Sequence, residues 1–257
     1  MARSRGEKPE KTRPGNPIKL TVRQHVYPAK LIEHFTNQTG YVDLHDIGRR
    51  LSFPAAPDNE RFCARRAWDH GTETGFMKRI EDRFHQALEP ILSCRVDRIT
   101  SRDRAAVDAM FALWFQRARN RELESQEVEL YGVLGSDLSK EQEETLEKNG
   151  YIFSRKNGKM PARLLNGTTV KLKVGRHSNE LKRLTGWGVV RALEGQFIVP
   201  DAPTKTILPV SPTVALIAEW PDGGASAWQV GYINQALRED CQDYFFAHNL
   251  TDCPGIS

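Results

Sequence analysis

The 257-residue chain is poor in the features that define several common protein classes. Its four cysteines include no C-x-x-C pair, which argues against disulfides and against a thiolate zinc site. No apolar run approaches the roughly 20 residues that a membrane-spanning helix needs. The N-terminus also lacks the apolar region of a secretory signal. These absences predict a cytoplasmic protein that does not enter a membrane.

Motifs of the common nucleotide and ester enzymes are also missing. The chain has no Walker loop, no G-x-G-x-x-G after a predicted strand and no G-x-S-x-G. Their absence argues against P-loop hydrolases, Rossmann dehydrogenases and α/β-hydrolases. The histidines show no H-x-x-x-H or similar ligand spacing. The sequence therefore predicts neither a metal nor a cofactor.

Charge is unevenly distributed along the chain. Residues 1–19 combine Lys and Arg with Pro and Gly and have almost nothing to bury, which predicts a disordered basic arm. Residues 122–148 carry nine acids against two lysines, whereas 155–183 carry nine Lys or Arg against Glu180 alone. The two blocks could neutralise each other, within one chain or across a homo-oligomer. Alternatively, the arm and the 155–183 block could bind nucleic acid.

The strongest helical pattern lies at residues 100–124. Thr100 and Asp103 have the spacing of a capping box at its start. Apolar side chains then recur on one face at helical spacing. They are Val107, Met110, Phe111, Trp114 and Ala118. Arg117 and Arg121 fall on the same stripe, and a buried guanidinium needs a partner because desolvating it alone is costly. The second half of this helix is therefore predicted to hold a polar site.

Other patterns complete the predicted architecture. Further helices are predicted at 29–36, 73–93 and 228–248, a strand at 41–47, and a Pro-rich connection at 52–60. Short β-rich runs between residues 186 and 220 predict a small sheet. The sequence thus predicts one α+β domain over 20–257, with a mainly helical core, a small C-terminal antiparallel or mixed sheet and a closing helix. A charged excursion is predicted at about 122–183.

Several short motifs occur in a defined order between residues 24 and 248. The first has the form H-x-x-P followed by an apolar residue and Phe, and an apolar-Glu pair and a helix-terminal Arg come next. A late strand, a P-x-S-P step and an Ile-Asn pair close the series. In this chain they are His25, Pro28, Ile32 and Phe35; Ile80-Glu81; Arg117; FIVPDAP at 197–203; PVSP at 209–212; and Ile233-Asn234.

This series resembles the uncharacterised, mainly bacterial family named domain of unknown function 4238. The late strand of that family reads F-I-x-S-D-N-P. Here Pro200 replaces the expected Ser and Ala202 the expected Asn, while Asp201 remains. If the Ser carries a reaction in the family, this chain lacks it. The resemblance implies no settled activity.

Five polar residues from distant segments are the candidate site. His25, Arg117 and Asp201 are the candidate catalytic residues, and Arg121 and Asn234 are the candidate binding residues. A His and an Asp can act as a base and its orienting carboxylate, whereas Arg suits phosphate. Together they suit metal-independent cleavage of RNA or DNA phosphodiesters. The predicted function is therefore an intracellular nuclease-like effector.

Three alternatives remain open for the same residues. They could form a buried polar network that fixes the helices against the sheet. The chain could also be a non-catalytic binding protein with a protein or nucleic-acid partner, or an enzyme acting on a small phosphorylated ligand. Convergence of His25, Arg117 and Asp201 on one open pocket would favour an enzyme. Contact between the 155–183 cations and the 122–148 acids would weaken the case for a nucleic-acid surface.

Overall fold

The helix predicted at 100–124 runs from Arg104 to Arg119 (α3) in a computed structural model that describes residues 8–256. Thr100 and Asp103 do pair before its first turn, since Thr100 Oγ1 donates to Asp103 Oδ2 at 2.6 Å and accepts from the Asp103 N–H at 3.2 Å. The helix ends earlier than predicted because the Asn120 side chain donates to the Gln116 carbonyl at 2.6 Å. The same carbonyl also accepts the backbone N–H of Asn120 at 3.0 Å, which is the C-cap bond of the helix.

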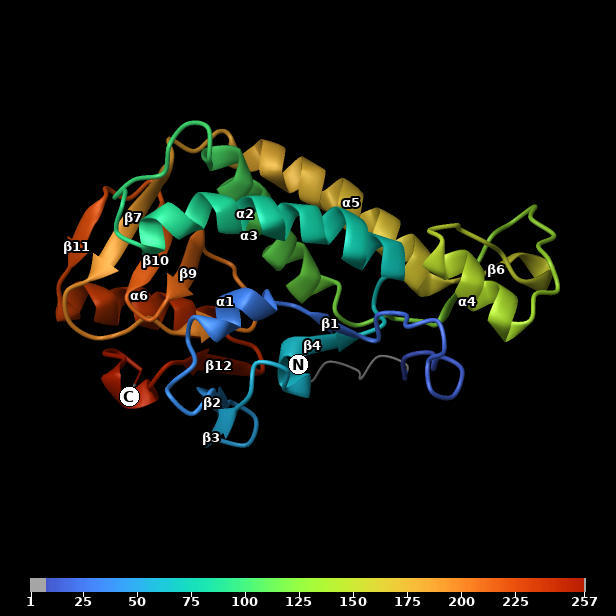
Figure 1. Cartoon of the computed structure of the whole chain (residues 1–257), viewed down its shortest axis with the longest axis horizontal. Coiled ribbons are helices and arrows are strands. Elements are labelled where there is room, and N and C mark those ends of the chain that lie inside the picture. The colour runs from blue at the N-terminus through green and yellow to red at the C-terminus, as the bar shows by residue number, and fades with distance from the viewer. Residues whose placement is uncertain (1–7, 257) are drawn as a thin grey trace.

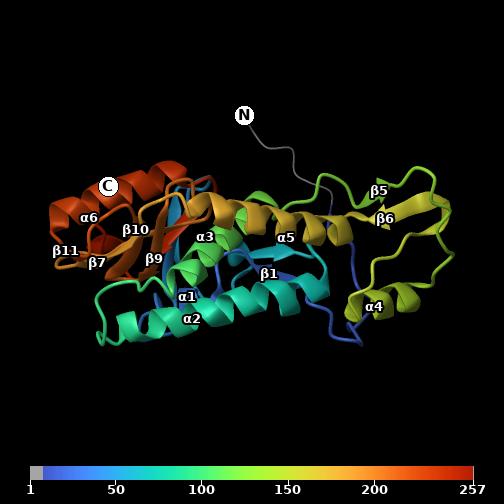
Figure 2. The ribbon, with the colours of Figure 1, turned by 90° about the horizontal axis from the view of Figure 1, so that it is seen from above.

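Two long helices pack against α3 from opposite sides, as Figure 2 shows. They are α2 (Lys78–Leu92), entered through a π-helical turn at Thr72–Met77, and α5 (Ala162–Leu181). Most of the basic block, predicted only as part of a charged excursion, forms α5, which is a single helix of 20 residues. Gly167 lets α5 lie close to the loop before α2, because a Cβ at this position would lie 1.9 Å from Asp69 Oδ2.

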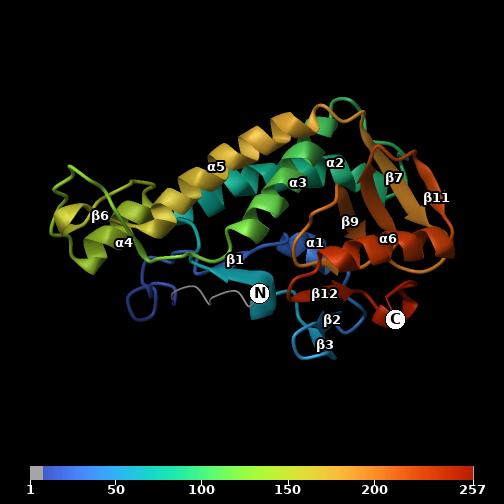
Figure 3. The same cartoon turned by 180° about the vertical axis from the view of Figure 1, so that it is seen from behind.

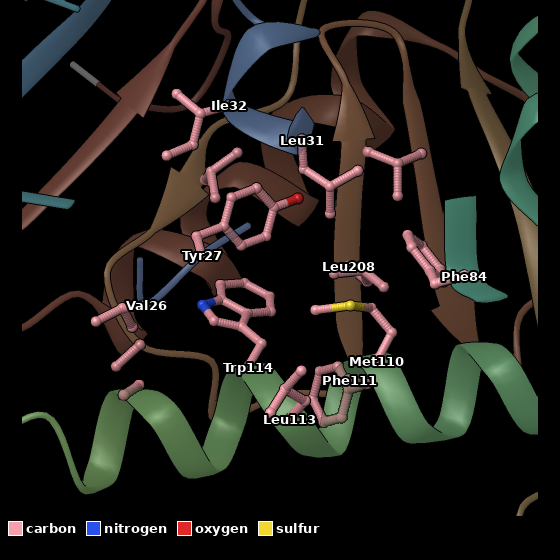
Figure 4. Close-up of a cluster of buried hydrophobic side chains, with 14 of the residues drawn as sticks. Val26, Tyr27, Leu31, Ile32, Phe84, Met110, Phe111, Leu113, Trp114 and Leu208 are labelled. Carbon is pink, nitrogen blue, oxygen red and sulfur yellow. The ribbon is translucent and has the colours of Figure 1, made fainter. Parts of the chain in front are cut away.

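The main apolar core lies around Trp114 and Met110 of α3 (Figure 4). Tyr27 packs edge-on against Trp114, with ring centroids 4.9 Å apart. Phe84 of α2 joins the same cluster. The helix face predicted from residue spacing therefore is the buried face. Burying large aromatic and aliphatic side chains is worth roughly 1.5–3 kcal/mol each.

The predicted C-terminal sheet is present and mixed. Its strand order is β11–β7–β10–β9, with β7 antiparallel to β10, β10 antiparallel to β9, and β11 parallel to β7. The strands are β7 (Trp187–Ala192), β9 (Ile207–Ser211), β10 (Val214–Ala218) and β11 (Gly223–Ala225). Helix α6 (Ala227–Asp240), which begins with a Ser226–Gln229 capping box, packs beside this sheet (Figure 1).

A second four-stranded sheet corrects the predicted architecture. Its order is β3–β2–β12–β8, all antiparallel. It contains β2 (Val42–Asp46), β3 (Leu51–Ala55), β8 (Val199–Pro200) and β12 (Tyr244–Ala247). The fold is mixed α+β, but the prediction of a mainly helical core with a sheet only near the C-terminus is wrong. Strand β3 also replaces part of the connection predicted at 52–60.

The closing helix predicted at 228–248 ends at Asp240 for a physical reason. The Asp240 carboxylate accepts the backbone N–H groups of Thr204 and Lys205, each at 2.9 Å, and Cys241 adopts an extended conformation. Tyr244, Phe245 and Phe246 are buried in the strand that follows. Aromatic residues suit a strand that is covered on both faces. The predicted helix ran too far because the spacing of Tyr244 and Phe245 continues the apolar pattern of α6.

The remaining elements are short. Two small antiparallel ribbons pair β1 (Arg23–His25) with β4 (Cys63–Arg65), and β5 (Glu127–Glu129) with β6 (Lys159–Pro161). Helix α1 spans Ala29–Glu33, and α4 spans Lys140–Lys148. Short 3₁₀ turns lie at Glu60–Phe62, Lys156–Gly158 and Leu250–Asp252. Among the helices of residues 8–256, none is long and apolar enough to cross a membrane.

Residues 127–163, which hold β5, α4 and β6, form a charged lobe at one end of the molecule (Figure 1). Arg155 of the basic block binds Glu143 at 2.5 Å and Glu127 at 2.7 Å, both from the acidic block. Arg163 binds Glu147 at 2.9 Å. The first part of the basic block therefore pairs with acids of the acidic block within one chain, which was one of the alternatives left open by the sequence.

The segment before β1 does not match the predicted disordered arm over the part that is described. Residues 1–7 lie outside the described residues. From residue 8 onward, the Glu10 carboxylate binds Arg155 at 2.6 Å and also pairs with Lys140 and Arg163. Arg13 binds Glu144 at 3.0 Å. Sequence composition suggested a basic tail, but one acid in it meets three cations of the lobe and holds the segment in place.

Glu10 should make the attachment of this segment depend on pH. Burial alone would raise the pKa of Glu10, but the charge of Arg163, with Lys140 and Arg155, outweighs burial and lowers that pKa from 4.5 to about 2. Because the pKa of Glu10 is lower in the folded protein than in the unfolded chain, its ion pairs contribute their full stabilisation above about pH 4.5. This contribution to the free energy of unfolding is lost as the pH falls towards about 2.

We expect Glu10→Gln to lower the free energy of unfolding by roughly 1–3 kcal/mol near neutral pH, because three cations lose a shared carboxylate. Urea unfolding of both proteins across the acid range measures the effect. The difference should shrink as the pH falls from about 4.5 to about 2. Glu124→Gln, at an exposed acid, is the matched control and should unfold like the unmodified protein. A difference that stays constant down to the lowest pH would contradict the role of Glu10.

Candidate functional site

Arg117, a predicted catalytic residue, is enclosed by partners. Its side chain is 1% exposed and binds Glu81 at 2.5 Å and Glu73 at 3.4 Å. The guanidinium also lies over the ring of Trp68, with 5.9 Å between Cζ and the ring centroid. The expectation that a buried guanidinium would have a partner is met by two carboxylates. These contacts leave the guanidinium tied to the start of α2 rather than facing an opening.

Asp201 and Arg121 are brought together by the structure. Arg121 Nη1 lies 3.1 Å from Asp201 Oδ2, and Arg121 also pairs with Asp243. Asp201 is fully buried and accepts the Gln242 N–H at 2.7 Å. Burial raises the pKa of Asp201, while the Arg121 charge and the backbone donors oppose that rise. This pair joins the end of α3 to the segment leading into β12.

Asn234 is completely buried in α6 and uses its amide to join three segments. Its Oδ1 accepts the Ile198 N–H at 3.1 Å. Its Nδ2 donates to the carbonyls of Gln196 at 2.8 Å and Pro254 at 3.0 Å. All partners are backbone groups, so this side chain fixes α6 against the extended segment 196–198 before β8 and against the C-terminal turn.

His25 lies on the outer face of the β1–β4 ribbon. Gln24 and Ala64 of the ribbon are buried, so the alternating residues His25 and Cys63, which are cross-strand neighbours, face the other way. His25 Nε2 lies 3.0 Å from the carbonyl oxygen of Pro57. A carbonyl only accepts, so Nε2 carries the proton of that bond and Nδ1 keeps the basic lone pair.

A cleft of about 370 Å³ opens beside this ribbon. It is lined on one side by β4 and its preceding turn and on the other by the residues that follow α3. Its floor includes Tyr244 of β12. The lining residues are Lys8, Pro9, Glu60, Arg61, Cys63, Ala64, Arg65, Arg121, Glu122, Leu123, Gln126, Asp243 and Tyr244. Of the five sequence-predicted residues, Arg121 lines the cleft and His25 lies cross-strand from its wall, whereas Arg117, Asp201 and Asn234 are not among its lining residues.

The cleft is rich in cations from separate segments. Lys8, Arg61, Arg65 and Arg121 come from the N-terminal segment, the turn before β4, β4 itself and the end of α3. Arg61 and Arg65 are 36% and 50% exposed and pair with Asp46 and Glu60. An exposed ion pair such as Arg65–Glu60 is worth about 0–1 kcal/mol, so the Arg65 guanidinium can exchange partners at low cost, whereas the partner of Arg61 is the buried Asp46.

The thiol of Cys63 is unsuited to nucleophilic chemistry. Burial raises the pKa of Cys63 to about 11, although the Arg23 charge opposes the rise. The thiol is therefore protonated near neutral pH, and a thiol is a much weaker nucleophile than a thiolate. Within residues 8–256, no group of three or more His, Cys, Asp or Glu side chains is placed to hold a metal ion. The chemistry that the cleft offers is the recognition of anions.

Sequence reasoning missed most of this cleft. The sequence signal for this cleft is a short arginine-rich run, which consists of Arg61, Arg65 and Arg66. Its members separate in the structure, since Arg66 is buried against Glu147 while the other two line the cleft. The contribution of Lys8 depends on a tertiary contact and had no local signal.

No protein-family model, curated protein or solved structure matches this chain. The resemblance to the domain of unknown function 4238 family therefore stays a prediction.

Replacing Arg117 separates a structural role from a catalytic one. We expect Arg117→Met to lower the free energy of unfolding by about 3–5 kcal/mol, because Glu73 and Glu81 lose their cation in a largely buried position. Arg119→Met, two residues along α3 at an exposed position, is the control and should cost less than about 1 kcal/mol. Urea unfolding midpoints measure both. Equal midpoints would show that Arg117 is not a structural residue.

Proposed function

We propose that this chain binds a phosphate ester in the cleft beside the β1–β4 ribbon. One observation carries the proposal: Lys8, Arg61, Arg65 and Arg121 converge from four separate segments on one cleft. Guanidinium groups match the geometry of phosphate oxygens and bind them with two parallel hydrogen bonds. The ligand class is therefore a phosphorylated molecule, either a small metabolite such as a nucleotide or a phosphate of a nucleic acid.

The size and surroundings of the cleft support this ligand class. A volume of about 370 Å³ lies near the lower end of the range for small-molecule sites. Leu123, Pro9 and Ala64 supply apolar wall beside the cations, which suits an organic group attached to the phosphate. Glu60 and Asp243 hold the arginines in place without a ligand, and a dianionic phosphate competes for the same hydrogen bonds.

Cleavage of RNA phosphodiesters is the second candidate, favoured by the position of His25 beside the cleft wall. Its Nδ1 retains a lone pair and could accept the proton of a ribose 2′-hydroxyl as that oxygen attacks the adjacent phosphorus. The bond from phosphorus to the 5′-oxygen breaks in the same reaction, the 5′-oxygen takes a proton from water, and a 2′,3′-cyclic phosphate remains. Arg121, and not the enclosed Arg117, would then stabilise the phosphate charge. In this form the nuclease-like hypothesis needs no metal and applies to RNA rather than DNA.

Membership of the domain of unknown function 4238 family is part of the same proposal. The motif segments that suggested it contact one another: Glu81 pairs with Arg117, and the Tyr27 hydroxyl donates to the Pro209 carbonyl. Asn234 binds residues flanking Phe197. Because these contacts are structural, they support a shared fold and leave the activity to be tested at the cleft.

Calorimetric titration with AMP and with adenosine tests phosphate binding. We expect AMP to bind and adenosine to bind at least tenfold more weakly, because only AMP offers the charged oxygens. Arg65→Ala should weaken AMP binding roughly tenfold, the effect of one charge-assisted hydrogen bond. Arg95→Ala is the matched control, since Arg95 forms an equally exposed pair with Glu89 away from the cleft. Equal losses in both variants would reject the site.

Labelled RNA and DNA strands incubated with EDTA test the second candidate. RNA cleavage that persists with EDTA, spares DNA and disappears in His25→Ala is the expected result. His45→Ala, at a histidine bonded to Ser52, serves as the control and should cleave normally. Intact RNA in every sample, together with retained AMP binding, would leave a non-catalytic binding protein.

A further inference from the structure

We propose that the outer face of α5 extends the cleft into a track for single-stranded nucleic acid. This inference rests on the proposed phosphate site and specifies its ligand as a polynucleotide. It concerns the second half of the basic block, which the charged lobe does not neutralise. We call this surface the α5 ridge: Lys173, Arg176 and Arg183, which lie along one side of α5 and the turn after it and are exposed, with Arg119 of α3 beside them.

The charge of the ridge is predominantly positive and exposed to solvent. Glu180 is the sole acid between residues 171 and 183. Among residues 8–256, the pair between Arg176 and Glu180, 3.1 Å apart and 84% and 51% exposed, is the only ion pair that the ridge cations make. By contrast, Arg155, Lys159 and Arg163 at the other end of the basic block are bound to acids of the lobe. The basic block is thus divided into a neutralised part and an available part.

The ridge continues directly into the cleft. Lys173 Nζ lies 3.2 Å from Asn120 Oδ1, and Asn120 immediately precedes Arg121, which lines the cleft. A second contact, from Asn166 Nδ2 to the Asn120 carbonyl at 3.1 Å, fixes α5 against the same turn. Figure 3 shows α5, the end of α3 and the β1–β4 ribbon on the face turned towards the viewer. Cations therefore follow one another from Arg65 through Arg121 and Lys173 to Arg176.

The length of the ridge suits a polymer. Residues 173–183 span about 15 Å at about 1.5 Å per helical residue. A stacked strand advances roughly 3.4 Å per nucleotide, so the ridge can follow about four phosphates. A single nucleotide in the cleft cannot reach these cations, and a second ligand class is not needed to explain them.

The track favours a single strand read through its backbone. A cleft of about 370 Å³ admits one nucleotide rather than a duplex. The ridge carries Leu172, 71% exposed, but no exposed aromatic side chain on which bases could stack. Affinity should then come from phosphate contacts, depend strongly on salt and depend little on base sequence.

Fluorescence anisotropy with labelled single-stranded DNA of about 12 nucleotides tests the track. We expect this strand to bind at least tenfold more tightly than AMP at low salt. In Lys173→Glu/Arg176→Glu, the strand should lose at least tenfold in affinity and its salt slope should fall by about 1.4, from two lost phosphate contacts. AMP binding by this variant should not change, whereas Arg65→Ala should weaken both ligands.

Arg79→Glu/Arg83→Glu is the control, because these exposed cations lie on α2, on the other side of α3 (Figure 2). This variant makes the same change in net charge and should bind the strand normally.

An equal loss of strand affinity in both double variants would overturn the track, because the loss would then be a general effect of net charge. AMP binding without tighter strand binding would reject the track and keep the phosphate site. Absence of AMP binding would reject the proposed function, and strand binding that resists Arg65→Ala would show that ridge and cleft are not connected.

Discussion

The cost of burying guanidinium groups constrains this structure more than any other interaction. Arg66, Arg117 and Arg163 are each at most 2% exposed, and each meets a carboxylate from a distant part of the chain. An unpaired charge at such depth is prohibitive, so the segments that supply these acids must arrive together. Glu73 and Glu81 thereby fix the start of α2 against the end of α3. Glu147 fixes α4, and with it the charged lobe, against α5 and the turn after β4. The apolar core supplies most of the burial, and these pairs determine which elements meet at its edges.

The same constraint separates structural arginines from those available for a ligand. The pairs of Arg117 lie inside the protein, and exchanging a carboxylate for a phosphate there would require opening the packing between α2 and α3. The pair of Arg65 with Glu60 lies in solvent and contributes little to stability, so a ligand can replace this acid without disturbing the fold, whereas Arg61 is held by the buried carboxylate of Asp46. Arg121 belongs to both groups, because its side chain is 10% exposed, lines the cleft and is held by buried Asp201. Such support gives a binding group a fixed position, which lowers the entropy lost when a ligand is bound.

Local patterns in the sequence identified elements better than they identified partners. The periodicity at α3, the Ser139–Gln142 capping box of α4 and the strands β7, β9 and β10 all follow from short-range preferences, and all are present. The spacing that predicted a long closing helix failed at Tyr244 to Phe246, because a strand covered on both faces also needs consecutive apolar residues. Strands β2 and β3 join a sheet with β12 some 200 residues later, and no local pattern encodes such a pairing. The acidic and basic blocks are visible in the sequence as charge runs. Which cations pair with acids depends on the tertiary contact between α4 and the start of α5, where Glu147 binds Arg163.

The candidate residues chosen from the sequence and the residues that line the cleft differ for a physical reason. Polar residues on apolar stripes are conspicuous in a sequence, and Arg117, Asp201 and Asn234 stood out in this way. A polar group at a core position is usually there because it completes a hydrogen-bond network, and Asn234 binds three backbone groups in that manner. Residues that contact ligands are more often half-exposed and placed on loops or at the ends of elements, where no periodic pattern distinguishes them from ordinary surface. Arg61, Arg65 and Lys8 have that character, and only the fold brings them to Arg121. The convergence of these cations on one cleft therefore depends on the tertiary fold, and local sequence patterns could not predict it.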